Sequence, residues 1–237
     1  MLYAGTSGFA YPSWKPRFYP KEVAAKKFLE YYSRRLNSVE INYTFHRLPA
    51  ATTLENWIAL TPEGFLFAAK AHERLTHQLR LKNAAEFTEV YLSSIDPLRA
   101  THRLGPILFQ LPPYFRCDVP CLDAFLGGLP KDLRYAFEFR HSSWLDDAVY
   151  RTLEKNNAAL CWAESEKLEV PEVSTANFAY FRLRKPEYPP EERKAISEAV
   201  RKLVTAGKDV FVFFKHENTP EGALYAEELL KSVTSVT

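Results

Sequence analysis

The sequence predicts a single (β/α)8 barrel of the TIM type that occupies residues 1–237 as one domain. Eight short apolar segments alternate with mostly amphipathic ones, which is the pattern of parallel strands joined by right-handed helical crossovers. A chain of 237 residues is long enough for a closed barrel of this kind. No glycine-rich G-x-G-x-x-G or G-x-x-x-x-G-K-[ST] loop follows the first strand, so an open doubly wound sheet is the less favoured alternative.

Strands are expected where apolar and β-branched residues cluster between turn signals. These segments are 2–7, 38–42, 65–70, 106–111, part of 134–144, 158–162, 178–183 and 210–215. Helices are expected at 23–36, 54–58, 83–105 with a kink at Pro97, 122–126, 146–155, 191–206 and after Thr219-Pro220. Thr52 with Glu55 and Asn83 with Glu86 have capping-box spacing. The link between the sixth and seventh strands is short and broken by proline, so its helix is expected to be reduced or absent.

Composition is typical of a globular protein. With 31 basic and 29 acidic residues the chain has no global attraction to nucleic acid, although a local basic patch remains open. No apolar run approaches the roughly 18 residues that span a bilayer, so no membrane association is expected. Cys117, Cys121 and Cys161 form no CxxC pair, which argues against a disulfide framework or a zinc knuckle. Neither a basic leader nor an apolar signal core follows Met1, so we expect a cytoplasmic location. The oligomeric state is open.

The strongest candidate for a chemical site is the stretch 134–144, where an apolar strand carries charged residues. Strand alternation places Glu138 and Arg140 on one face and Phe137 and Phe139 on the other. Ionised side chains cost several kcal/mol to desolvate unless they are paired, so this strand is predicted to run into a polar pocket. The alternative is a purely structural ion pair.

Other predicted strands also end in polar residues. In a barrel of this type, catalytic groups lie at the C-terminal ends of the strands and in the loops beyond them. The residues at these ends are Ser7, Glu40, Asn42, Lys70, Gln110, Glu138, Arg140, Arg182 and Lys215. Ion pairs that only stabilise the fold would have no reason to lie always at the same end of the strands. This distribution therefore predicts a site at the barrel mouth.

The residue types at the mouth allow more than one chemistry. Glu40 and Glu138 could form an acid and base pair. The cations Arg140, Arg182, Lys70 and Lys215 outnumber these two acids, which favours an anionic ligand. Trp14 and Trp144 lie among polar loop residues and are predicted to stack on a base or a sugar. Ser7 has no G-x-S-x-G context, so it is read as an oxygen ligand or a turn residue.

A metal site has weaker support. His46, His72, His77 and His141 fall in or near loops after strands and could combine with Glu40 or Glu138. None of them has H-x-H or H-E-x-x-H spacing, so no metal ligand is assigned. No cofactor is implied, and a role for a divalent metal is left open.

Several motifs resemble those of the YecE-like family, a domain of unknown function numbered 72. They are Gly5-Thr-Ser-Gly8 with Tyr11 and Trp14, Phe18-Tyr-Pro20, Val39-Glu-Ile-Asn42 with Thr44-Phe45 and Arg47-Leu-Pro49, Leu104 to Pro113, and Glu138-Phe-Arg-His-Ser-Ser-Trp144. The resemblance runs from the first strand to the last helix. It implies a TIM-type barrel of unsettled activity.

Two loops depart from the family pattern. Arg184-Lys185 stands where the family tends to have His-Gly, and Lys215-His-Glu-Asn218 stands where it tends to have a pair of asparagines. The extra charge at these positions is expected to shift the ligand preference.

Three functional hypotheses follow. The first is an enzyme, with hydrolysis as the candidate reaction, that acts on a phosphate-bearing substrate such as a nucleotide or nucleic-acid fragment. In it Arg140, Arg182 and Lys70 hold the anion, Glu138 is the general base, Glu40 with Asn42 orients the substrate and His141 is a candidate acid. The second is a carbohydrate-active hydrolase that uses Glu40 and Glu138, and the third is a non-catalytic module that binds single-stranded nucleic acid through residues 11–21 and 184–185.

Overall fold

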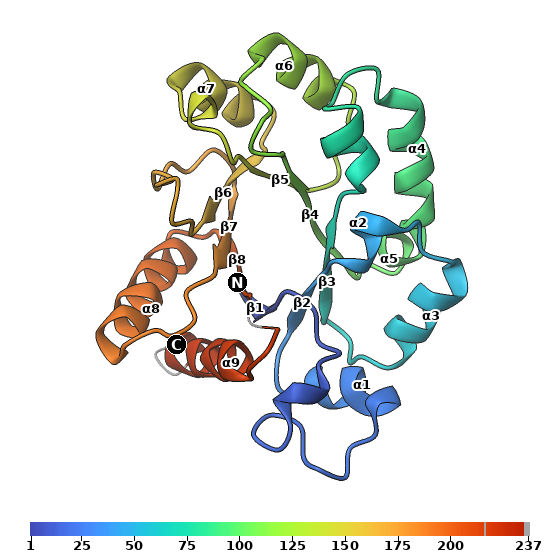
Figure 1. The fold of residues 1–237 in the computed structure, drawn as a ribbon, viewed down its shortest axis with the longest axis vertical. Helices are drawn as coiled ribbons and strands as arrows, with labels where there is room; N and C mark the ends of the chain where they lie inside the picture. Colours follow the sequence, from blue (N-terminus) through green and yellow to red (C-terminus); the bar gives the residue numbers. More distant parts are fainter. Residues whose placement is uncertain (216, 235–237) are drawn as a thin grey trace.

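The computed structural model describes residues 1–215 and 217–234, and within them eight parallel strands form a nearly closed barrel with helices outside it (Figure 1). The strands are β1 (Leu2–Thr6), β2 (Ser38–Ile41), β3 (Leu66–Lys70), β4 (Leu104–Gln110), β5 (Tyr135–Glu138), β6 (Ala159–Ala163), β7 (Phe178–Leu183) and β8 (Asp209–Phe214). Their order in the sheet is β1-β8-β7-β6-β5-β4-β3-β2. The predicted TIM-type barrel is confirmed.

The helices follow the strands with one predicted exception. They are α1 (Phe28–Tyr32), α2 (Tyr43–His46), α3 (Ala51–Ala59), α4 (Ala85–Ser94), α5 (Asp96–Ala100), α6 (Val119–Gly127), α7 (Asp147–Lys155), α8 (Pro190–Thr205) and α9 (Glu221–Thr234). Shorter helical turns lie at Pro12–Trp14, Ala25–Lys27, Arg74–Gln78 and Ser142–Trp144. No helix occurs in residues 164–177, so the expected reduction after β6 is confirmed. None of the described helices combines the length and the apolar character needed to cross a membrane, and the cytoplasmic location stays a prediction.

Some predicted helix boundaries are wrong. The helix expected at 23–36 is a 3-10 turn followed by the five-residue α1. The segment expected to be one long helix is two, α4 and α5, and Pro97 lies in the first turn of α5. Proline lacks the backbone N–H that an interior helical position needs, but the first turn leaves that group unpaired in any case.

Both predicted capping boxes are also wrong. α3 begins at Ala51, so Thr52 lies inside it, and α4 begins after Ala84 with no side-chain cap. Asn83 is instead in the left-handed region, with φ of 49°. The spacing of a capping box is a purely local signal, whereas the path of the preceding loop decides where a helix starts. α7 keeps its predicted start, because the Asp146 carboxylate accepts a hydrogen bond from the backbone N–H of Ala148.

The barrel interior is filled unevenly, with rings from one side and small side chains from the other. The rings come mainly from β7 and β8 and the small side chains mainly from β3, β5 and β6. The cluster consists of Phe178, Tyr180, Phe211 and Phe213 with Ala68, Ala136, Ala159, Cys161, Ala163 and Ala176, and Leu108 of β4 completes it. An eight-stranded barrel is only wide enough for its own side chains, so large groups on one side require small groups opposite them. This packing fills the centre of the barrel with side chains.

β1 and β2 meet along the seam where the barrel closes. The direct backbone contact between them is short: Ser7 and Glu40 form a bridge, and the Gly8 N–H donates to the Glu40 carbonyl at 2.9 Å. A Cβ at Gly5 would lie 1.9 Å from the Ser38 carbonyl oxygen. Only glycine therefore allows the two strands to approach this closely.

Side chains replace the missing strand-to-strand hydrogen bonds along the seam. The Tyr32 hydroxyl accepts from the Thr6 N–H at 2.8 Å and donates to the Ser38 carbonyl at 3.0 Å. The Asn37 amide oxygen accepts from the Ala4 N–H at 2.8 Å, and the Asn37 amide nitrogen donates to the Leu2 carbonyl of β1 at 2.8 Å. Buried backbone groups need such partners, so Tyr32 and Asn37 stabilise the closure that brings Ser7 beside Glu40.

Candidate functional site

The predicted alternation along β5 is confirmed, and it directs the polar residues toward the barrel mouth. Phe137 and Phe139 pack in the outer apolar layer, whereas Ala136 belongs to the barrel interior. Glu138 and Arg140 follow Ala136 on the inner face at steps of two residues. Polar residues at the ends of the other strands also occupy inward-facing positions. The site is therefore assembled from these positions above the packed interior.

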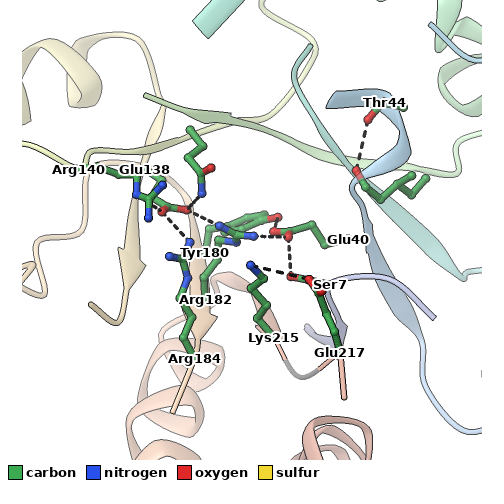
Figure 2. A network of polar contacts seen from close by, with 12 residues as sticks. Ser7, Glu40, Thr44, Glu138, Arg140, Tyr180, Arg182, Arg184, Lys215 and Glu217 are labelled. Atoms are coloured by element: carbon green, nitrogen blue, oxygen red, sulfur yellow. Dashed lines mark hydrogen bonds and ion pairs between the residues drawn. The ribbon is translucent and has the colours of Figure 1, made fainter. Parts of the chain in front are cut away.

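Arg182 lies at the centre of the site and joins the two predicted carboxylates (Figure 2). Its Nη1 donates to Glu138 Oε2 at 2.5 Å, and its Nη2 donates to Glu40 Oε1 at 2.7 Å. Arg182 is 2% exposed, Glu138 1% and Glu40 0%. A buried arginine holding two buried carboxylates is a fully desolvated ion cluster, whose charges depend on one another for compensation.

Glu40 has further donors that keep it ionised. The Ser7 hydroxyl donates to Oε1 at 2.6 Å and the Tyr180 hydroxyl donates to Oε2 at 2.7 Å. Burial alone would raise the pKa of Glu40, but Arg182 and these hydroxyls outweigh it and hold the pKa below its usual value. Burial and the neighbouring Glu40 raise the pKa of Tyr180 far above its usual value, so Tyr180 stays a donor.

Glu138 is held in the same way by three donors. Besides Arg182, Gln110 Nε2 donates to Oε2 at 2.9 Å and Arg184 Nη2 donates to Oε1 at 2.7 Å. Burial raises the pKa of Glu138, but Arg182 and Arg184 with these hydrogen bonds lower it to about 2. A carboxylate with such a low pKa is a weak base at neutral pH, which argues against the predicted role of Glu138 as general base.

A cavity of about 230 Å³ opens above this cluster. Its walls come from the C-terminal ends of the strands and the loops after them, and its lining is mostly polar. The lining residues are Asn42, Phe45, His46, Lys70, Gln110, Arg140, Arg182, Arg184, Lys215 and Glu217. The structure therefore brings Asn42, Lys70, Gln110, Arg140, Arg182 and Lys215 of the predicted set together around one cavity, with Glu40 and Glu138 beneath it.

The cations around the cavity differ in how tightly they are paired. Arg140 Nε lies 3.9 Å from Glu138 Oε1, and Lys215 Nζ lies 3.8 Å from Glu217 Oε1. Both side chains are 42% exposed, so these loose pairs contribute little stability. Lys70 Nζ lies 3.9 Å from the ring centroid of Phe45. These three cations keep most of their capacity to bind an anion.

Four further predicted site residues do not line the mouth cavity. Trp14 and Trp144 are completely buried, so the prediction that they are stacking platforms is wrong. Trp144 stacks on Phe139, and Trp14 packs among the rings of the first loop. His141 Nδ1 accepts from the Ser143 N–H and caps the turn Ser142–Trp144, and it does not line the cavity.

The fourth, Ser7, is 1% exposed and donates its hydroxyl hydrogen bond to Glu40.

The aromatic residues of the first loop were predicted wrongly because sequence neighbours alone do not show whether a ring in a loop is exposed or packed. Large aromatic side chains stabilise the fold most when they are fully buried. The rings of residues 11–21 pack into the core, so the stacking surface that the nucleic-acid hypothesis placed there is absent from this segment.

Two contributors to the site were not assigned to it from the sequence. Tyr180 lies two positions before Arg182 on the same face of β7, and Arg184 lies two positions after it. Strand periodicity could have identified both. Arg184 is one of the departures from the family pattern, and it binds Glu138, whereas Lys185 pairs with Glu192 on the surface. His216 in the second departing loop lies outside the described residues.

No group of three His, Cys, Asp or Glu residues in 1–215 and 217–234 is arranged to hold a metal ion. A wider depression of about 670 Å³ lies on the surface beside Tyr114 and Arg116. None of the predicted site residues lines it, and the buried ion cluster lies under the smaller mouth cavity. The chemistry of the residues therefore identifies the mouth as the candidate site.

Fold and site define a TIM-type barrel protein with a buried ion cluster beneath a cationic mouth. The chain belongs to the family described as "Protein of unknown function DUF72", whose model matches residues 3–236. It is 30% identical over 172 residues to the UPF0759 protein YunF of Bacillus subtilis (strain 168), which is 70% of this chain and 60% of YunF. It is 30% identical over 142 residues to the UPF0759 protein YecE of Escherichia coli (strain K12), which is 60% of this chain and 49% of YecE.

The chain thus spans about half to three fifths of the length of these two relatives in the matched regions. The crystal structure of a DUF72 family protein from Thermotoga maritima MSB8 is similar over 99% of both chains, with a TM-score of 0.88 and 28% identity. The names of these relatives state no activity and no substrate.

Proposed function

We propose that the protein is an enzyme that binds a small phosphate-bearing substrate in the mouth cavity. The observation that carries this proposal is the excess of positive charge. Among the described residues, five cationic side chains surround or underlie the cavity, and three carboxylates oppose them. The cations are Lys70, Arg140, Arg182, Arg184 and Lys215, and the carboxylates are Glu40, Glu138 and Glu217. Two positive charges are left uncompensated, which matches a doubly charged phosphate group.

Two buried donors add to this support. The Nε atoms of Arg182 and Arg184 are buried and have no hydrogen-bond acceptor among the described residues. Buried guanidinium N–H groups are costly to leave unpaired, and both arginines line the cavity. These unpaired donors add to the positive potential at the cavity wall, which favours a bound anion.

The contacts divide the predicted residues into two roles. Arg140 and Lys215 are only loosely paired and contact the anion in this proposal, and Lys70 lines the same cavity beside them. Glu40 and Glu138 hold Arg182 in place and do not transfer protons, because their pKa values are lowered. A cavity of about 230 Å³ is smaller than the roughly 300 to 1,000 Å³ of drug-sized ligand sites, so a short phosphate ester fits better than a whole nucleotide.

The carbohydrate alternative has less support. A glycosidic bond must lie between two carboxyl groups, one acting as acid and the other as base or nucleophile. Here the Arg182 guanidinium occupies the space between Glu40 and Glu138 and binds both. The pair is therefore arranged as an ion cluster rather than as a catalytic couple.

Anion binding is tested first by calorimetry with inorganic phosphate, sulfate and short phosphate esters. Arg140→Ala should weaken phosphate binding by roughly tenfold, since one charge-assisted contact at a half-exposed site is lost. Arg116→Ala is the matched control, because Arg116 is an exposed arginine outside the mouth, and it should bind like wild type. Equal weakening by both variants, or no binding by wild type, would remove the proposal.

Turnover is tested with a panel of phosphomonoesters, phosphodiesters and sugar phosphates, with and without divalent metals. The expected result is turnover of a short phosphate ester that Lys70→Met abolishes and Arg116→Ala leaves unchanged. If wild type binds phosphate esters and converts none of them, the protein is a binding module and not an enzyme.

A further inference from the structure

Lys70 is the one cation of the mouth that has no carboxylate partner within 4 Å among the described residues. The other four, Arg140, Arg182, Arg184 and Lys215, each have at least one. Its amine instead lies 3.9 Å from the ring centroid of Phe45. The face of an aromatic ring stabilises an ammonium group less strongly than a carboxylate does. This contact therefore favours the protonated form of Lys70 less than an ion pair would.

The position of Lys70 is fixed by contacts to its backbone. It is the last residue of β3, and the Thr44 hydroxyl on α2 donates to its carbonyl at 2.7 Å. The Tyr91 hydroxyl on α4 donates to the same carbonyl at 3.3 Å. Phe45 follows Thr44 on α2, so one short helix holds both the strand end and the ring beneath the amine. A reactive side chain requires a rigid support of this kind to hold it in position.

The surroundings of the amine favour its neutral form. Burial, with Arg182 and Lys215, lowers the pKa of Lys70 to about 8 against the opposing effect of Glu40 and Glu138. His77 also faces this amine, and its own pKa is lowered by burial and by Lys70. At pH 7 a pKa near 8 instead of 10.5 makes the neutral fraction of the amine about 300-fold larger. Desolvation beside other cations is a recognised way to activate a lysine nucleophile.

We propose that Lys70 is a nucleophilic amine that forms a Schiff base with a small aldehyde or ketone carrying a phosphate group. The proposal rests on the proposed function, because Arg140 and Lys215 hold the phosphate while the carbonyl carbon faces Lys70 Nζ. The Asn42 and Gln110 amides line the same cavity and are placed to orient the carbonyl oxygen.

The step balances without a further reactant. The lone pair of neutral Nζ adds to the carbonyl carbon, and one amine proton moves to the carbonyl oxygen to give a carbinolamine. The carbon–oxygen bond then breaks, the second amine proton leaves with the oxygen as water, and a carbon–nitrogen double bond remains. Protonation of this imine makes it an electron sink for breaking a neighbouring C–H or C–C bond.

The test is reductive trapping of the full chain with glycolaldehyde phosphate and sodium cyanoborohydride, followed by intact mass measurement and peptide mapping. The expected result is one adduct per chain, located on Lys70, forming at least tenfold faster than adducts on any other lysine. Acetaldehyde, which lacks the phosphate, should label Lys70 more slowly. Lys82→Arg is the matched control, because Lys82 lies outside the mouth and pairs with Asp118 at 2.9 Å, so Lys70 of this variant should be trapped as in wild type.

Lys70→Arg keeps the positive charge and removes the nucleophile, so it should still bind inorganic phosphate, and it should give no specific adduct. Reaction of wild type with trinitrobenzenesulfonate over a pH series gives a second measurement, with a midpoint for Lys70 near pH 8. Labelling spread evenly over surface lysines, or a Lys70 midpoint above pH 10, would overturn the inference. If phosphate binds and Lys70 is never trapped, this inference alone fails. If Lys70 is trapped equally by acetaldehyde and phosphate does not bind, the proposed phosphate site fails instead.

Discussion

Replacement of Arg182 by methionine should destabilise the protein strongly at neutral pH and much less in acid. The side chain is 2% exposed and contacts Glu40 at 2.7 Å and Glu138 at 2.5 Å. Without it two buried carboxylates lose their shared cation, and breaking a buried ion pair in this way costs about 3–5 kcal/mol. Protonation limits the cost, because holding one carboxyl of ordinary pKa 4.5 neutral at pH 7 costs about 3 kcal/mol. Arg184 still compensates Glu138, so the total should stay within about 3–5 kcal/mol.

The pH dependence follows from the sign of each shift. In wild type the lowered pKa values of both carboxyls stabilise the fold above about pH 4.5, and this stabilisation is lost as the pH falls toward 2. In Arg182→Met the burial of Glu40 is no longer compensated by a cation and raises its pKa, so its destabilising effect is present at neutral pH and is relieved by acid. The difference between the two proteins should therefore shrink between pH 7 and pH 4.5.

Urea denaturation at pH 7 and pH 4.5, with thermal unfolding in parallel, measures this difference. For a chain of this size a loss of 3–5 kcal/mol corresponds to a fall of about 6–20 °C in Tm. Arg99→Met is the control, because it breaks a surface pair with Asp132 at 2.7 Å and should cost below about 1 kcal/mol. Adding Glu40→Gln and Glu138→Gln to Arg182→Met should recover much of the loss. A cost below about 1 kcal/mol at pH 7, or the same cost at both pH values, would refute the idea of a mutually dependent ion cluster.

Two further predictions concern Glu138 and the barrel seam. Glu138→Gln should flatten the loss of stability between pH 4.5 and pH 2, because the lowered pKa of this carboxyl contributes to that slope; an unchanged slope in acid denaturation would contradict it. Tyr32→Phe should cost about 2–4 kcal/mol in urea denaturation, because it leaves the Thr6 N–H and the Ser38 carbonyl without a partner. Tyr31→Phe is the control, since no hydrogen bond of the Tyr31 hydroxyl occurs among the described residues, and an equal cost for both variants would argue against the seam.

The order and direction of the strands could be predicted from the sequence because they depend on local patterns. Apolar segments separated by helical ones require parallel pairing, and the two-residue period along 136–140 was enough to place Glu138 and Arg140 on the inner face. The convergence of Asn42, Lys70 and Gln110 then followed from the fold, since parallel strands all end at the same side of a barrel.

The pairing within the mouth depended on the tertiary structure. The sequence shows that cations and carboxylates share the strand ends, but not that Arg182 binds both Glu40 and Glu138 while Lys70 binds neither, because side chains from distant strands meet only in the closed barrel. The same applies to Trp14 and Trp144, whose sequence neighbours are polar although their spatial neighbours are rings. The two-residue period along each strand thus determined which way a residue faces, and packing across the barrel decided which charges are tightly paired and which are not.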